Sequence, residues 1–164
     1  MDFTQHLQTW TKGDLQQGKW MIGIAVLIIF PICILFIKTS NSLQKGMLIP
    51  FGLLFLINVG YGSYLLISKP KYVIERTTQF QLNAEETIEK EVAKIKADDK
   101  SYTMTKYVWV GILVLSVFCF FIFNKEYFQG LALGFGIMFM GMLLIDVFLH
   151  NRLEYYLKVL QNIT

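Results

Sequence analysis

Two ionisable residues near the end of an apolar stretch are the ones in this sequence best placed to do chemistry. Asp146 closes a long uncharged run, and His150 follows one helical turn later. An acid inside a membrane segment is a candidate functional site, because its charge is costly to bury. Asp146 also lies close enough to the end of the run to reach water. The alternative role is therefore an ion pair or hydrogen bond with His150, Arg76 or Arg152.

A second polar group lies in the middle of an earlier apolar stretch. Asn58 is followed closely by Tyr61, Ser63 and Tyr64. An asparagine at that depth needs a hydrogen-bond partner, which another helix typically supplies. Alternatively, Asn58 and Tyr61 line a polar cavity. Together with Asp146 and His150 they form the candidate polar site of the membrane segments.

Glycines in the last apolar stretch predict close helix packing. Gly130, Gly134 and Gly141 fall within about 40° of one another, since each residue turns a helix by about 100°. Such a smooth face lets two helices approach closely in lipid, where the hydrophobic drive is absent. The face is predicted to pack within the monomer, and a subunit interface is the alternative.

Several chemistries need residues that this sequence does not offer. Cys33 and Cys119 form no CxxC motif and are interpreted as small apolar residues. His6 and His150 are the only histidines, so deep haem ligands are missing, and no cluster of His, Asp and Glu suggests a metal. Phosphate-binding glycine loops and nucleophile motifs are absent from the sequence. We therefore expect no catalytic residue, no cofactor, no metal and no enzymatic activity.

The composition shows which elements must position these residues. Hydrophobic residues make up 54% of the 164 and charged residues only 16%, whereas a soluble domain is about a quarter charged. Four stretches reach the roughly 20 apolar residues that cross a bilayer: residues 20–37, 46–68, 107–124 and 127–149. A cleaved signal peptide is the alternative for the first, but no small-residue cleavage site follows it. The predicted fold is all-α, an antiparallel four-helix membrane bundle forming a single domain over residues 1–164.

The basic residues predict how the chain is threaded. With four spans, both termini and the central segment share one side of the membrane. That side carries twelve of the fifteen Lys and Arg residues, and the other side carries only Lys38, Lys45 and Lys125. Lys and Arg are enriched in cytoplasmic loops. The N-terminus, residues 69–106 and residues 150–164 are therefore predicted to be cytoplasmic, and the two short loops external.

The predicted cytoplasmic segments are expected to form a helical layer beneath the bundle. Phe3, Leu7 and Trp10 share one helical face, which predicts a helix lying on the membrane surface and ended by Gly13, or else a frayed terminus. Apolar residues also continue at helical spacing after Asp146, so the fourth helix is predicted to project three or four turns beyond the membrane.

The central segment is predicted to hold a second helix of this layer. Pro70 is expected to break or kink the chain. Asn83 and Glu86 resemble a capping box for a helix from Ala84 to about Ala97, with Glu86 and Lys90 as an i, i+4 pair. Three apolar residues of this helix form a stripe at i, i+4 and i+7: Ile88, Val92 and Ile95. The stripe is expected to pack on the membrane surface, on the N-terminal helix or on another subunit; alternatively, the helix is a solvated connector.

The last third of the sequence resembles a group of small, uncharacterised four-span bacterial membrane proteins. The resemblance rests on the run from Gly130 to Gly134, the segment Leu144-Ile-Asp146, then Asn151-Arg152 and Tyr155-Tyr156-Leu157. It implies a bacterial inner membrane and carries no activity with it.

These observations favour a protein that works by binding another protein rather than by catalysis. An immunity or accessory protein that meets its partner in the bilayer is one form, and a scaffold for a cytoplasmic partner is the other. The alternative is an oligomeric channel or small-solute transporter lined by Asn58, Tyr61, Asp146 and His150. The expected partners are membrane lipids, a second protein and possible further copies of the chain. The net charge of +3, without a basic patch, does not favour nucleic acid.

Overall fold

The computed structural model describes residues 3–161, and every regular element in that range is a helix. The elements are α1 (Phe3–Ile24), a π-helical segment η1 (Ala25–Ile29), α2 (Phe30–Lys38), α3 (Ser42–Leu82), α4 (Ala84–Ile122) and α5 (Glu126–Gln161). The first three follow one another without a gap, so they form one rod. The described chain therefore consists of four long helical rods, which confirms the predicted all-α four-helix fold.

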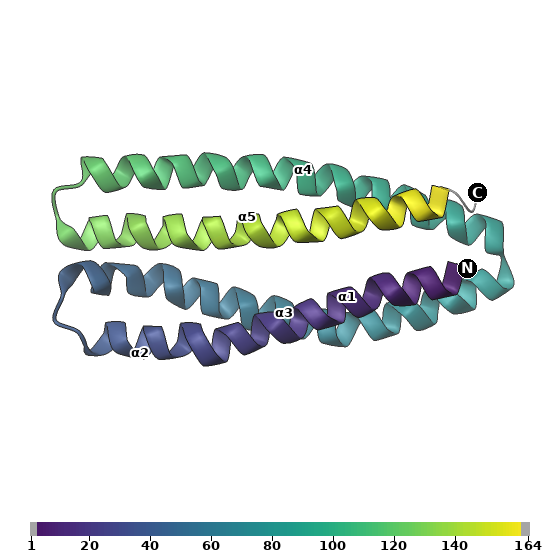
Figure 1. Cartoon of the computed structure of the whole chain (residues 1–164), viewed down its shortest axis with the longest axis horizontal. Helices are drawn as coiled ribbons and strands as arrows, with labels where there is room; N and C mark the ends of the chain where they lie inside the picture. Colours follow the sequence, from purple (N-terminus) through teal and green to yellow (C-terminus); the bar gives the residue numbers. More distant parts are fainter. Residues whose placement is uncertain (1–2, 162–164) are drawn as a thin grey trace.

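The rods form two antiparallel hairpins that lie side by side (Figure 1). One hairpin is made by the first rod and α3, and the other by α4 and α5. The hairpins meet mainly where α3 packs along α5. Both ends of the chain and the α3–α4 turn lie at one end of the bundle, and the other two turns lie at the opposite end.

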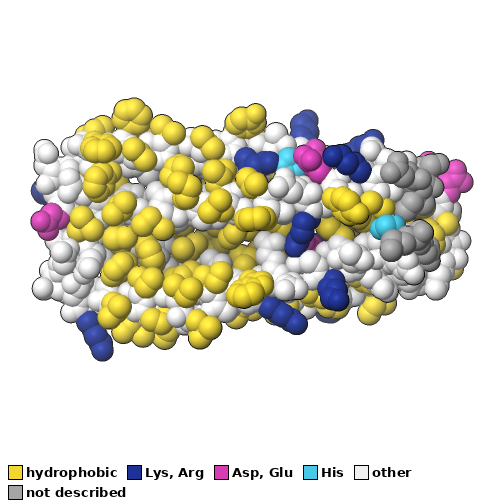
Figure 2. Space-filling model, viewed as in Figure 1, with side chains coloured by type: hydrophobic (Ala, Val, Ile, Leu, Met, Phe, Trp, Pro, Cys, Tyr) yellow, Lys and Arg dark blue, Asp and Glu magenta, His cyan; other side chains and the backbone are white. Residues whose placement is uncertain are grey.

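Each rod is about twice as long as a bilayer core is thick. The 41 residues of α3 extend for about 60 Å at 1.5 Å per residue, against about 30 Å of hydrocarbon. All four rods contain a window that is long and apolar enough to cross a membrane. Hydrophobic side chains dominate the surface towards the end with the two short turns, and charged side chains gather towards the other end (Figure 2). We call residues 3–18, 69–106 and 150–161 the extramembrane half.

The extramembrane half has a hydrophobic core of its own, built from all four rods. Phe3 and Leu7 of α1 are almost completely buried there. They pack in one cluster with residues of α4 and α5, namely Ile88, Ile95, Leu153, Tyr156 and Leu160. The predicted stripe on the central segment thus packs against other helices and is not a solvated connector.

The N-terminal helix differs from the prediction in two respects. It passes through Gly13 without interruption, and its apolar face is covered by protein rather than by the membrane surface. The buried residues of α1 recur every three or four positions from Phe3 to Met21. This continuous contact with the bundle outweighs the helix-breaking tendency of one glycine, which is only about 1 kcal/mol.

The helices also continue through Pro70 and past Ala97, where a break and a helix end were expected. Pro70 lies inside α3, and Asp98 and Asp99 lie inside α4. Packing on both sides of these positions stabilises helical backbone that local preference disfavours. Pro31 is preceded by η1, where wider i→i+5 bonding relieves the clash of a proline ring with the preceding turn.

The α3–α4 turn follows the sequence prediction closely. The Asn83 side chain accepts a hydrogen bond from the Glu86 amide at 3.3 Å, and its amide donates to the Glu86 carboxylate at 3.0 Å. Lys90 contacts Glu86 at 2.5 Å. A reciprocal cap of this kind satisfies donors at the first turn that have no partner within the helix.

Candidate functional site

The three glycines of α5 that were predicted to form one face, Gly130, Gly134 and Gly141, do not act together. A Cβ atom at Gly130 would overlap the carbonyl oxygen of Leu43, and one at Gly134 would lie 2.8 Å from Cγ of Pro50, so both glycines allow α5 to touch α3. Gly141 has no described atom within 4 Å of the same position. Gly130 and Gly134 therefore pack within the monomer, and Gly141 does not take part.

Asn58 is buried, but its side chain stays on its own helix. Only 4% of the residue is exposed, and its Nδ2 donates to the carbonyl oxygen of Leu54 at 2.8 Å. The position of Asn58 within an apolar stretch predicted a partner on another helix. Back-bonding to the preceding turn satisfies the amide without one.

Asp146 is held by a residue that the sequence analysis did not consider. The Trp109 indole of α4 donates to Asp146 Oδ2 at 2.6 Å. The three predicted partners, His150, Arg76 and Arg152, all bond elsewhere. The prediction was wrong because it considered charged groups alone, whereas an indole N–H on the facing helix also satisfies a carboxylate.

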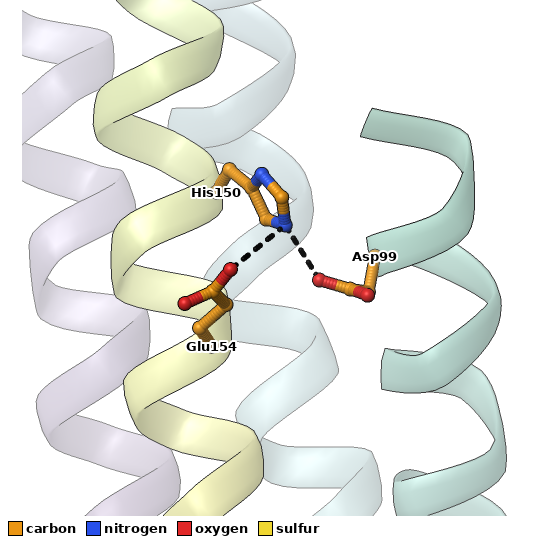
Figure 3. Close-up of side chains that lie close together, drawn as sticks. All are labelled: Asp99, His150 and Glu154. Carbon is orange, nitrogen blue, oxygen red and sulfur yellow. Dashed lines mark hydrogen bonds and ion pairs between the residues drawn. The ribbon is translucent and has the colours of Figure 1, made fainter. Parts of the chain in front are cut away.

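His150 lies in a cluster of ionisable groups between α4 and α5 (Figure 3). Its Nε2 is 2.6 Å from Asp99 Oδ1 and 3.4 Å from Glu154 Oε1. On the other side of the ring, Nδ1 contacts Nζ of Lys106. The expectation that His, Asp and Glu do not cluster was therefore wrong. The i, i+4 pair of His150 and Glu154 was visible in the sequence, but Asp99 is 51 positions from His150.

A second charged group, which we call the Asp14 cluster, joins three helices near the ends of the spans. Asp14 of α1 is 3% exposed. It pairs with Lys69 of α3 at 2.6 Å and with Arg152 of α5. The Lys69 ammonium also lies 4.3 Å from the ring centre of Trp10. Asp14 was not among the predicted site residues. The available signal was its spacing of three or four positions from Thr11 and Gly18, which places it on the same helical face as Leu7.

The Asp14 cluster borders a small polar cavity of about 40 Å³. Tyr61 lines it together with Tyr102 of α4. A cavity of this size and polarity can hold ordered water. Tyr61 thus belongs to the charged boundary of the spans, and not to a polar track with Asn58.

A third cluster of polar side chains lies in the extramembrane half, further from the predicted spans than the Asp14 cluster. Glu91 of α4 is fully buried. Its carboxylate accepts from the Tyr72 hydroxyl at 2.6 and 2.5 Å, and Arg76 Nε lies 3.3 Å away. Burial raises the pKa of Tyr72 well above its ordinary range, and the Glu91 charge adds to this shift. Tyr72 therefore stays protonated and remains a donor at physiological pH.

A groove with aromatic walls runs between α1 and α5, from the edge of the fourth predicted span into the extramembrane half. Its volume is about 460 Å³, and we call it the α1–α5 groove. Phe148 and Tyr155 are 69% and 70% exposed along it. The remaining lining residues are His6, Thr9, Trp10, Gly13, Asn151, Arg152, Tyr156 and Val159.

Comparison with known proteins adds no relative to this description. No protein-family model matches the chain, and no curated protein and no solved structure matches it.

Proposed function

We propose that the chain is a multi-pass membrane protein that works by binding another protein, and that the α1–α5 groove is its docking surface. The four apolar rods support insertion in a bilayer. The excess of Lys and Arg on one side favours cytoplasmic termini. The resemblance of the last third favours a bacterial inner membrane.

The observation that carries the proposal is apolar surface exposed outside the spans. Exposed apolar side chains within a span face lipid at no cost. The groove extends beyond the predicted spans. Lys106 directly precedes the third predicted span and contacts His150, so His150 marks the edge of the membrane on α5. Tyr155 and Val159 lie further out along α5. A contiguous apolar patch in water marks an interaction site.

The groove fits an amphipathic helix of the partner. From Phe148 to Val159 it follows about 16 Å of α5, or three turns. The described residues that line it include Arg152 and His6 but no acid. Asp14 is shared by two cations, Lys69 and Arg152, so these three groups carry a net positive charge. We therefore expect apolar anchors and at least one acidic residue on the partner helix.

The channel hypothesis is less well supported by the described side chains. A pore needs polar groups that are free to face a path at several depths. Asn58 bonds to its own helix and Asp146 to Trp109. Tyr61 lines the small cavity beside Tyr102, and His150 contacts Asp99. These four candidates therefore serve contacts within one protomer.

Photocrosslinking in cells tests the docking proposal. A photoreactive amino acid replaces Tyr155, whose side chain is exposed in the groove. We expect one protein adduct at this position, and we expect it to disappear in the double variant with Val159→Asp, because an acid would then face an acidic partner. The matched control is Ile74→Asp, which places the same charge on an exposed position of α3 outside the groove.

Three results would contradict docking in the groove. One is an adduct that survives Val159→Asp. Another is the same adduct from a photoreactive residue at Met104, which is 71% exposed on α4. The third is crosslinking to lipid alone.

A further inference from the structure

The cluster of Asp99, His150 and Glu154 presents three ligand atoms to one point in space. His150 and Glu154 are one turn apart on α5, and Asp99 approaches from α4 (Figure 3). Their ligand atoms, one imidazole nitrogen and two carboxylate oxygens, all lie within 4.8 Å of one another. The histidine is 7% exposed, so packing fixes its ring.

Two carboxylates this close to one nitrogen need a positive charge between them. Like charges at short range destabilise each other, and a proton or a cation must compensate. A proton on Nε2 can compensate the two charges in the metal-free state, but it serves the carboxylates unequally. Nε2 lies 2.6 Å from Asp99 Oδ1 and 3.4 Å from Glu154 Oε1. A divalent ion would satisfy both carboxylates at once.

We propose that Asp99, His150 and Glu154 form a binding site for a divalent transition metal ion, with Zn²⁺ as the best fit. Zinc takes nitrogen and carboxylate ligands at 2.0–2.2 Å in a tetrahedron, which places ligand atoms about 3.4 Å apart. The 3.4 Å between His150 Nε2 and Glu154 Oε1 matches this value. The 2.6 Å between Nε2 and Asp99 Oδ1 is a hydrogen-bond distance, which a bound ion would lengthen. The Asp99 and Glu154 side chains are 36% and 49% exposed, so water can supply the fourth ligand. Metal sites in helical bundles are commonly built from facing helices in this way.

Lys106 acts as a competitor of the metal. Its ammonium contacts Nδ1 of His150, and a nitrogen that accepts from lysine leaves the ring proton on Nε2. Metal coordination needs the lone pair of Nε2. If only Nε2 carries a proton, that proton must move to Nδ1 when the metal binds; if both nitrogens are protonated, the Nε2 proton must leave. In either case Nδ1 carries a proton, so Lys106 must turn away. The bound ion would replace a lysine contact by a direct link between α4 and α5 at the boundary of the spans.

Zinc titration of the purified full chain in detergent micelles tests the site, with a competing chromogenic chelator as the readout. We expect one Zn²⁺ per chain. Glu154→Gln and Asp99→Asn each keep the shape of the side chain, and each is expected to weaken binding by more than about tenfold, since even outer-shell losses cost about 10–100-fold. Lys106→Met is expected to bind roughly tenfold more tightly, because it removes a charge within about 6 Å of the ion.

The controls separate this site from nonspecific binding. His6→Ala removes the other histidine of the sequence and is expected to leave the affinity unchanged. A rise in the thermal midpoint on adding Zn²⁺ is expected in the wild type and not in Glu154→Gln. Zinc binding that is absent, equal in Glu154→Gln and wild type, or abolished by His6→Ala would overturn the assignment.

Discussion

Replacing Gly130 by alanine is expected to destabilise the bundle strongly, whereas the same change at Gly141 is not. At Gly130 the added Cβ meets the backbone of Leu43, and backbone cannot turn aside as a side chain can. The reciprocal contact, Gly46 against the carbonyl of Tyr127, is equally close. Overpacking of this kind costs about 1–3 kcal/mol. Unfolding in mixed micelles by a denaturing detergent, followed by tryptophan fluorescence, measures the loss.

Gly141→Ala is the matched control, because the described structure places no atom within 4 Å of its added Cβ. Alanine is also the better helix former, by about 1 kcal/mol. We therefore expect this variant to be as stable as the wild type or slightly more stable. Equal destabilisation by the two variants would mean that Gly130 does not pack against α3 as described.

Removal of the Glu91 carboxylate is expected to have the second large effect. The side chain is completely buried between Tyr72 and Arg76, so Glu91→Ala leaves a cation and a hydroxyl without their partner. Loss of one member of a buried ion pair costs about 3–5 kcal/mol. The extramembrane half should open first, because Glu91 joins α4 to α3 there. Trp10, which stacks on Tyr156 at 4.9 Å between ring centres, reports this opening through its fluorescence.

Glu89→Ala is the control on the same helix. Glu89 is exposed, and exposed substitutions change stability by no more than about 0.5 kcal/mol. If Glu91→Ala were as stable as Glu89→Ala, the buried group around Glu91 would not hold α4 against α3.

The sequence was most informative where structure depends on near neighbours. Asn83, Glu86 and Lys90 lie within eight positions, and their cap and ion pair form as predicted. The breaks expected at Gly13 and Pro70, and the helix end expected near Ala97, are absent from the structure, because local breaking tendencies are weaker than the packing of long rods.

The polar clusters were less predictable than the helices, because their contacts join distant parts of the chain. Asp14 and Arg152 are 138 positions apart, and His150 and Asp99 are 51 apart. Periodicity places a residue on one face of a helix but does not identify the residue that faces it. Asn58 and Asp146 were found because each is a polar residue in or at the end of an apolar stretch, whereas their partners Leu54 and Trp109 were not.

The central claim is that each rod crosses lipid and then continues into water, where the groove is exposed. Exposed side chains on α5 form a stripe that can test it: Leu133, Ile137, Met140, Leu144, Phe148 and Tyr155. Spin labels are attached to single cysteines at these positions in vesicles, with Cys33 and Cys119 replaced by serine. Collision rates with oxygen, which prefers lipid, and with a water-soluble relaxing agent then give the depth of each label.

We expect labels from Leu133 to Leu144 to meet oxygen, the label at Tyr155 to meet the water-soluble agent, and the change between them to fall near Phe148. Contact of Tyr155 with lipid would contradict the account, because the groove would then lie in the membrane. Contact of Leu133 to Leu144 with water would contradict it equally, because α5 would then cross no bilayer.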